Sequence, residues 1–123
     1  MATIQNIAVT TDANGDATAY STPIEGRLFG FYHDGALDAG VDFTLTGETS
    51  GVPILTIADA GAAAAWRWPR LQVHNSANGV ALTLDGLHKN VDEVYLRDYE
   101  RIKIVVAGGG NALTGALKIV TDG

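Results

Sequence analysis

The sequence predicts an all-β domain, either a β-sandwich or a jelly-roll-like barrel, with about eight to ten short antiparallel strands. Apolar residues recur at a spacing of two along most of the chain, which is the period of a half-buried strand. Turn-forming Gly, Asp and Asn residues interrupt these runs at intervals of about 8–12 residues. No stretch shows the 3.6-residue period of a long helix, so we expect little helical structure.

The composition indicates one folded domain that spans residues 1–123. The chain has 46% hydrophobic and 18% charged residues, proportions that are typical of a globular protein. A chain of this length buries roughly two-thirds of its unfolded surface, which suffices for a core without covalent staples. Because the sequence contains no cysteine, it excludes disulfides and thiolate metal sites.

The N-terminal part of the chain contains three predicted strands, at residues 3–10, 17–21 and 25–33. A turn at residues 11–16 separates the first two. This turn contains Asn14 and Gly15, a pair that favours the positive φ values of a hairpin turn.

The same turn suggests a calcium loop, because Asp12, Asn14 and Asp16 alternate as they do in an EF-hand. That loop requires glycine at its sixth position and a bidentate glutamate at its twelfth. Here Gly15 stands at the fourth position and Pro23 at the twelfth. We therefore interpret the segment as a turn and expect no metal there.

The strand at residues 25–33 is apolar on both faces. At a spacing of two, Phe29 and Phe31 share one face, and Leu28 and Tyr32 share the other. A pattern of this kind is typical of a central strand, or of a strand whose outer face meets another chain.

The clearest alternation follows, at residues 41–46. A turn at residues 47–51 leads to a strand at residues 52–57, whose early proline favours an edge position. The alanine-rich segment 59–65 is too short to form a stable helix alone, so we expect a loop.

The next predicted strand, residues 66–74, has an unusual composition. One face would carry Trp66, Trp68, Arg70, Gln72 and His74, and the other would carry Arg67, Pro69, Leu71 and Val73. A turn at residues 75–79 follows.

Four further elements precede the C-terminal segment. They are a short strand at residues 80–84, a loop at 85–92, a strand at 94–96 and a turn at 98–100.

The C-terminal segment gives the strongest strand signal. Residues 101–107 and 113–121 both place β-branched residues at a spacing of two, and a glycine-rich loop at residues 108–110 separates them. The sequence therefore predicts a long β-hairpin.

No motif indicates catalysis or a cofactor. His33, His74 and His88 have no metal-ligand spacing, and no serine lies in a GxSxG context. The glycines at 108–110 precede a predicted strand, whereas a phosphate-binding loop opens a helix. The carboxylates near the last strands fit a solvated rim better than a glycosidase pair. We expect no catalytic, cofactor or metal site, and no enzyme.

The charge and hydropathy patterns argue against two classes of partner. The formal net charge of −6 disfavours a nucleic-acid-binding protein, which needs clustered Lys and Arg. No apolar run reaches the roughly 18 residues of a membrane span. Residues 1–5 lack the basic and apolar regions of a signal peptide, so we expect none.

Tryptophan and arginine are the residues most enriched at interaction hot spots, and four of them stand together at Trp66, Arg67, Trp68 and Arg70. Paired tryptophans on one strand face are also common in cores, so the sequence leaves both a core role and an interface role open. Under the interface hypothesis, the apolar residues Phe29 and Phe31 belong to the same contact surface.

Three groups of turn and strand residues support a family resemblance that extends over most of the chain. They are residues 10–12 (TTD) with 15–21 (GDATAYS), residues 40–48 (GVDFTLTGE), and residues 101–110 (RIKIVVAGGG) with 114–115 (TG). In these segments the chain resembles a family of small virion proteins of tailed bacteriophages and prophages, which are encoded among head and neck genes.

The resemblance implies a non-enzymatic viral structural protein that packs against copies of itself and against a shell. The leading hypothesis is a capsid decoration (cement) protein, acting as a homotrimer on the major capsid protein. It would be made in the host bacterial cytoplasm and would lie on the capsid exterior in the virion. The alternatives are a neck or tail-attachment virion protein, or a carbohydrate-binding β-sandwich module with Trp66 and Trp68 as a stacking platform.

Overall fold

The computed structural model describes residues 2–72, 77–80, 92–93 and 95–122, and every regular element in these ranges is a β-strand. The strands are β1 (Ala2–Thr10), β2 (Ala17–Tyr20), β3 (Ile24–His33), β4 (Asp42–Gly47), β5 (Pro53–Ile57), β6 (Ala65–Arg67), β7 (Leu71–Gln72), β8 (Asp92–Glu93), β9 (Tyr95–Glu100), β10 (Ile102–Ala107) and β11 (Thr114–Asp122). The predicted all-β fold is confirmed.

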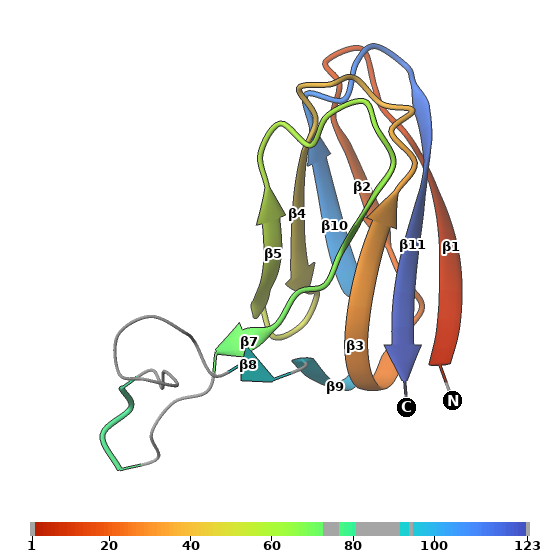
Figure 1. Cartoon of the computed structure of the whole chain (residues 1–123). Coiled ribbons are helices and arrows are strands. Elements are labelled where there is room, and N and C mark those ends of the chain that lie inside the picture. The colour runs from red at the N-terminus through yellow and green to blue at the C-terminus, as the bar shows by residue number, and fades with distance from the viewer. Residues whose placement is uncertain (1, 73–76, 81–91, 94, 123) are drawn as a thin grey trace.

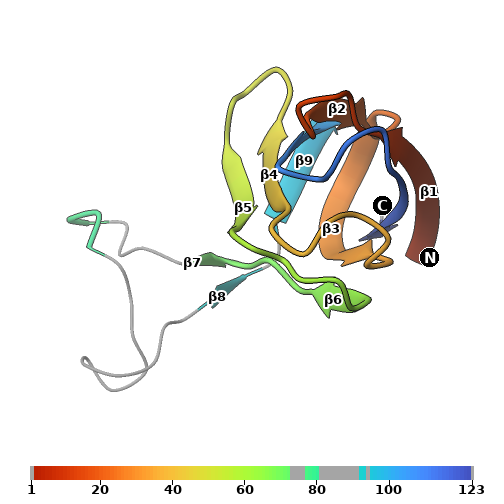
Figure 2. The same cartoon turned by 90° about the horizontal axis from the view of Figure 1, so that it is seen from above.

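Two antiparallel sheets face each other as the layers of a sandwich (Figures 1 and 2). The larger sheet has the order β1-β11-β3-β6, and β9 also pairs with β3. The smaller sheet has the order β2-β10-β4-β5. The short pair β7–β8 extends away from both sheets.

The strand pairing is nested, which is the arrangement of a jelly roll. The first strand pairs with the last, β1 with β11, and the second pairs with the second-last, β2 with β10. Next inward, β3 pairs with β6 and β9, and β4 pairs with β5 at the centre of the nest. The chain therefore passes from one sheet to the other at most of its turns.

The predicted C-terminal hairpin is wrong for this reason. β10 lies in the smaller sheet between β2 and β4, whereas β11 lies in the larger sheet between β1 and β3. Each of the two strands has one apolar face. These two faces pack against each other across the core, so the strands do not pair with each other within one sheet. Alternation at a spacing of two identifies a strand, but it does not say which strand pairs with it.

The turn at residues 11–16 also connects the two sheets. As predicted, it is a turn. The Oδ1 atom of Asp12 accepts hydrogen bonds from the N–H groups of Asn14 and Asp16, at 2.8 and 3.0 Å. Gly15 has a φ of 83°, which glycine adopts without strain.

The core fills the space between the two sheets. Most of its fully enclosed side chains come from the two layers: Leu28, Phe31, Leu117 and Ile119 from the larger sheet, and Phe43, Leu45, Ile102, Ile104 and Val106 from the smaller one. They lie at alternate positions within β4, β10 and β11, as a half-buried strand requires.

Strand β3 departs from this alternation because it contains a β-bulge. Gly30 lies opposite Val120 and Leu28 lies opposite Thr121, so Phe29 is the extra residue. As a result Leu28 and Phe31, three positions apart, are both buried at 0% exposure. Strict alternation predicts that Phe29 and Phe31 share one face of the strand. Because of the bulge, Phe31 lies in the core and Phe29 does not.

Three other predicted elements differ from the structure. The strand predicted at 66–74 is interrupted after Arg67, and residues 68–70 are not in a strand. This segment contains Pro69, which has no N–H to donate to a ladder. The turn predicted at 98–100 is instead the last part of β9. Val80 is not in a strand. Residues 81–84, most of the loop predicted at 85–92, and both His74 and His88 lie outside the described residues.

Candidate interaction surface

Four aromatic side chains gather on the outer face of the larger sheet, beside its β6 edge. We call Phe29, Tyr32, Trp66 and Trp68 the aromatic surface. Trp66 is 39% exposed and Trp68 is 56% exposed, so neither belongs to the core of this chain. The structure therefore removes the core alternative for the tryptophan pair.

Three rings of the aromatic surface, those of Tyr32, Trp66 and Trp68, contact one another in a row. The indoles of Trp66 and Trp68 are stacked, with centroids 5.3 Å apart and planes within 6°. Tyr32 lies directly opposite Trp66 across the β3–β6 pair, and its ring centroid is 4.9 Å from that indole. Contacts of this kind hold the rings in place, so the surface is ordered before any partner binds.

Gly30 makes room for this arrangement. A Cβ atom on residue 30 would lie 2.6 Å from Cζ3 of Trp68 and 2.7 Å from its Cε3. The absence of a side chain therefore lets the indole lie directly against the backbone of β3.

Three cationic side chains border the aromatic surface. The guanidinium carbon atoms of Arg27 and Arg70 lie 5.8 and 5.9 Å from the ring centroid of Phe29. The Nζ atom of Lys118 lies 5.5 Å from the ring centroid of Tyr32. These distances fit cation–π contacts, and they give the surface a positive rim, although Arg27 also pairs with Asp122 at 3.5 Å.

Arg70 also ties the segment after β6 to the sheet. Its Nη1 donates hydrogen bonds to the carbonyl oxygens of Phe29, at 2.9 Å, and Pro69, at 2.7 Å. Of the predicted interface residues, the structure thus brings together Trp66, Trp68, Arg70 and Phe29.

The other two predicted interface residues lie elsewhere. Phe31 is 0% exposed and packs edge-on against Phe43, with ring centroids 5.4 Å apart. It is a core residue, and the interface prediction is wrong for it. Arg67 alternates with Trp66 along β6 and points to the opposite face, where its charge acts on His33.

Sequence reasoning missed Tyr32, Gly30 and Lys118. The bulge at Phe29 moved Tyr32 onto the outer face, and no local pattern reveals a bulge. Lys118 and Tyr32 lie directly opposite each other in the β3–β11 register, which becomes visible only when the pairing is known.

One end of the sandwich is strongly acidic. The loops 11–16, 34–41, 58–64 and 108–113 meet at this end (Figure 1), and none of them contains Lys or Arg. Here we find six aspartates, at the loops or at the first position of β4: Asp12, Asp16, Asp34, Asp38, Asp42 and Asp59. The other eight Asp and Glu residues equal the eight Lys and Arg residues in number, so this acidic end accounts for the whole formal net charge of −6.

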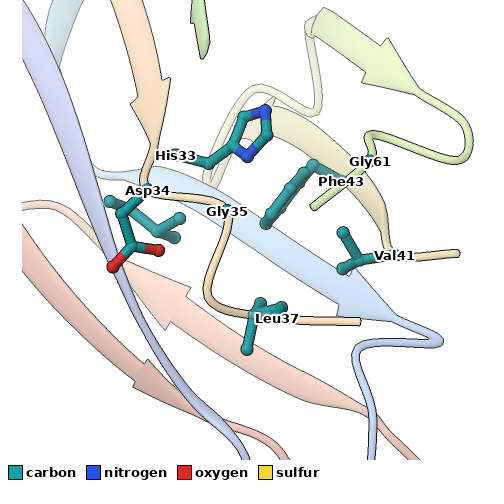
Figure 3. Close-up of a pocket in the computed structure, with 8 residues that line it drawn as sticks. His33, Asp34, Gly35, Leu37, Val41, Phe43 and Gly61 are labelled. Carbon is teal, nitrogen blue, oxygen red and sulfur yellow. The ribbon is translucent and has the colours of Figure 1, made fainter. Parts of the chain in front are cut away.

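A small hollow lies under the 34–41 loop (Figure 3). Its walls include His33, Leu37, Val41, Phe43 and Leu117. His33 is 2% exposed, and its Nε2 has no hydrogen-bond partner among the described residues. The hollow is too narrow for a water molecule, so it is a packing feature and not a ligand site.

The environment of His33 favours its neutral form. Burial lowers the pKa of His33 most strongly, the positive charge of Arg67 lowers it further, and the carboxylate of Asp34 raises it in part. This matters for the acid stability of the fold.

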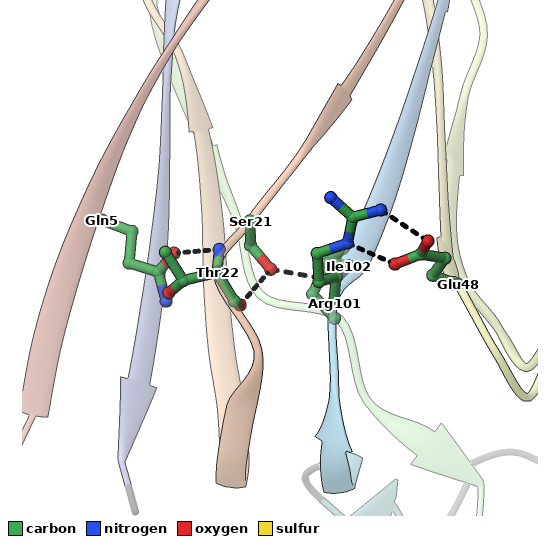
Figure 4. Close-up of polar contacts among 6 residues, drawn as sticks. All are labelled: Gln5, Ser21, Thr22, Glu48, Arg101 and Ile102. Atoms are coloured by element: carbon green, nitrogen blue, oxygen red, sulfur yellow. Dashed lines mark hydrogen bonds and ion pairs between the residues drawn. The ribbon is translucent and has the colours of Figure 1, made fainter.

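Polar contacts close the opposite end of the sandwich (Figure 4). The hydroxyl of Ser21 accepts a hydrogen bond from the N–H of Ile102 at 2.8 Å and donates one to the carbonyl of Thr22 at 2.8 Å. The side-chain oxygen of Gln5 accepts a bond from the N–H of Thr22 at 3.0 Å. These bonds satisfy backbone groups where β2 ends, which is a structural role.

Arg101 and Glu48 form a two-pronged ion pair at the same end (Figure 4). The guanidinium carbon of Arg101 also lies 4.1 Å from the ring centroid of Tyr20. The hydrogen bond with Arg101 lowers the pKa of the Glu48 carboxyl. Both side chains face solvent, so we assign the pair no catalytic task.

Within residues 2–72, 77–80, 92–93 and 95–122, no group of three or more His, Asp and Glu side chains could hold a metal ion. The same residues include no helix long and apolar enough to cross a membrane. The aromatic surface is therefore the strongest candidate for function in the described part of the chain.

No family model matches the chain, and no curated protein matches it.

Proposed function

We propose that this chain is a decoration (cement) protein of a tailed-phage head. In this proposal it binds the exterior of the capsid, contacts the major capsid protein and acts as a homotrimer, with no catalytic role. The sequence resemblance to small phage virion proteins motivates the proposal, and three features of the fold support it.

The observation that carries the proposal is the exposed, stacked pair Trp66–Trp68. Soluble monomers rarely expose contiguous apolar patches unless a partner covers them, and buried tryptophans dominate the binding energy of many interfaces. We therefore assign the aromatic surface to the contact between copies.

The charge distribution supports a closed ring of copies. The aromatic surface has Arg27, Arg70 and Lys118 at its border, whereas the acidic end has six aspartates. Contact between the aromatic surface of one copy and the acidic end of the next pairs opposite charges. A contact between two different surfaces generates a ring when the rotation from each copy to the next returns to the first copy. A trimer is such a ring.

The fold class is compatible with this role, because jelly rolls occur in viral capsid proteins, although they also occur in lectins and cupins. A carbohydrate-binding module is the second candidate, since exposed tryptophans bind sugars by stacking. Here the two indoles stack on each other, so each already uses one of its two faces. This arrangement favours a protein partner.

Locating the protein in purified virions tests the proposal. We expect antibody labelling over the whole head surface. Quantitative mass spectrometry should give a copy number similar to that of the major capsid protein. Labelling confined to the neck would favour the attachment-protein alternative. Absence from virions, together with glycan binding that Trp68→Ala abolishes, would favour the carbohydrate-binding module.

A further inference from the structure

Strand β1 forms one edge of the larger sheet and pairs only with β11 among the described strands. Nine consecutive residue pairs join the two strands without a shift in register. The hydrogen bond from the N–H of Thr11 to the carbonyl of Leu113 continues this ladder, and in an antiparallel pair every second residue makes such bonds. The even-numbered residues of β1 therefore direct their backbone groups away from β11: Ala2, Ile4, Asn6, Ala8 and Thr10.

The other edge of β11 agrees with this assignment. The carbonyl of Ala116, an even-numbered residue, accepts a hydrogen bond from the N–H of Asp34, which follows β3. Even-numbered residues of β11 thus bond toward β3, and odd-numbered ones bond toward β1.

The free edge of β1 lacks the features by which proteins usually protect an edge strand. Residues 2–10 include no charged residue and no proline, and no bulge interrupts the pairing with β11. All five even-numbered residues are exposed, and Ile4 is 55% exposed. A long, regular, neutral edge is a template for another strand.

We propose that this edge binds β1 of a second copy of the chain, antiparallel, about a two-fold axis at Asn6. Two chains of net charge −6 repel each other, so a contact between copies is least opposed where the strand carries no charge, as β1 does. The proposed register pairs Asn6 with Asn6, and Ile4 with Ala8 of the second copy. All nine residues of both strands then overlap, and the small Ala8 leaves space for Ile4.

This contact is separate from the aromatic surface and does not rest on the proposed function. It has two-fold symmetry, whereas the proposed trimer contact joins two different surfaces. If trimers occupy local three-fold positions of a shell, neighbouring trimers are related by local two-fold axes. The β1 contact then joins one trimer to the next.

Single cysteines test the register, because the natural chain has none. In an Asn6→Cys variant the two cysteines face each other at a Cα separation of about 5.5 Å, which suits a disulfide. We expect mild oxidation to give a covalent dimer of Asn6→Cys but little dimer of Ala8→Cys. A mixture of Ile4→Cys and Ala8→Cys should form the mixed dimer. Equal dimer yields from Asn6→Cys and Ala8→Cys would overturn the proposal.

A charge on the edge provides the second test. Asn6→Lys places two like charges opposite each other, whereas Asn6→Ser keeps the edge neutral. Both variants are made in a Trp68→Ala background, so that the outcome does not depend on the aromatic surface. We expect sedimentation to show at least tenfold weaker dimerisation of the lysine variant. Equal association of the two variants, with equal melting temperatures, would contradict the edge contact.

Discussion

The indole of Trp68 lies against the backbone of Gly30, where a Cβ atom would stand 2.6 Å from Cζ3 of the ring. One glycine in β3 thus allows a large aromatic side chain to approach the backbone of the sheet closely. The same strand contributes Phe31 to the core, so β3 links the stability of the fold to the shape of the aromatic surface.

This relationship predicts that Gly30→Ala disturbs the aromatic surface but not the fold. The new methyl group must displace Trp68, which is 56% exposed and whose ring can shift outward without disturbing the core. We expect a changed near-ultraviolet circular dichroism signal from the Trp66–Trp68 stack and a change of less than about 1 kcal/mol in the free energy of unfolding.

Gly40→Ala is the matched control, because the nearest atom to a Cβ at residue 40 is Oδ1 of Asp59, 3.9 Å away. It should leave the tryptophan signal unchanged. A Gly30→Ala protein with the natural tryptophan signal would refute the close contact.

The loop between β10 and β11 packs on the β1–β2 turn, and a second glycine tests this. The N–H of Gly109 donates to the carbonyl of Gly15 at 2.8 Å, and a Cβ at residue 15 would lie 2.9 Å from that nitrogen. Gly51 also has a positive φ, but no atom lies within 4 Å of its Cβ position.

We therefore expect Gly51→Ala to cost about 1–2 kcal/mol from backbone strain alone. Gly15→Ala should cost at least about 1 kcal/mol more, because it also breaks the contact between the two turns. Urea unfolding of the two variants measures the difference. Equal losses would argue against the packing of these loops.

The buried His33 predicts a loss of stability in mild acid. Its pKa in the folded protein lies below the ordinary value of 6.5, so the unfolded chain binds the proton more readily. The stabilisation is therefore complete above pH 6.5 and decreases as the pH falls from about 6.5 through the folded-state pKa. Each unit of pKa difference corresponds to about 1.4 kcal/mol.

His33→Leu should remove this pH dependence, because leucine cannot take up a proton, and its apolar side chain still fills the space beside Phe43, Val41 and Leu117. Unfolding free energies measured between pH 7.5 and 5 provide the test, because in this range the ordinary carboxylates remain ionised. If the variant and the natural protein lose the same stability over this range, another group is responsible.

The assignment of Phe31 to the core gives a further prediction. Phe31→Ala should lower the free energy of unfolding by about 3–5 kcal/mol, because it leaves a cavity beside Phe43. Thermal melting and urea unfolding measure this loss. If the variant melts like the natural protein and yet fails to assemble, Phe31 belongs to the contact surface after all.

The strands themselves were largely predictable from the sequence. The run from Ile102 to Val106 alternates cleanly, and so does the run from Phe43 to Leu45, because each faces the core on one side only. The Asn14–Gly15 turn was also predictable, since its chemistry is local.

The pairing of the strands was not predictable, because it depends on contacts between distant residues. β10 and β11 follow each other along the chain, yet the jelly-roll nesting places β1 beside β11 and β2 beside β10. The bulge at Phe29 has no local signature either, and it decided which aromatic residues of β3 are buried. The sequence thus identified Trp66, Trp68, Arg70 and Phe29 as interface candidates but misassigned Phe31.

The aromatic surface is proposed as a contact between protein copies, and the assembly mass of the Trp68→Ala variant shows whether it is one. In an Asn6→Lys background, which removes the proposed β1 contact, light scattering coupled to size-exclusion chromatography, beside a thermal melt, should show a trimer for the protein that keeps Trp68. The variant should melt at nearly the same temperature but form a smaller species, because removal of a hot-spot tryptophan weakens assembly by about 2 kcal/mol or more. A monomer in the presence of Trp68, or a Trp68→Ala variant that remains trimeric, would mean that the aromatic surface is not the contact between copies.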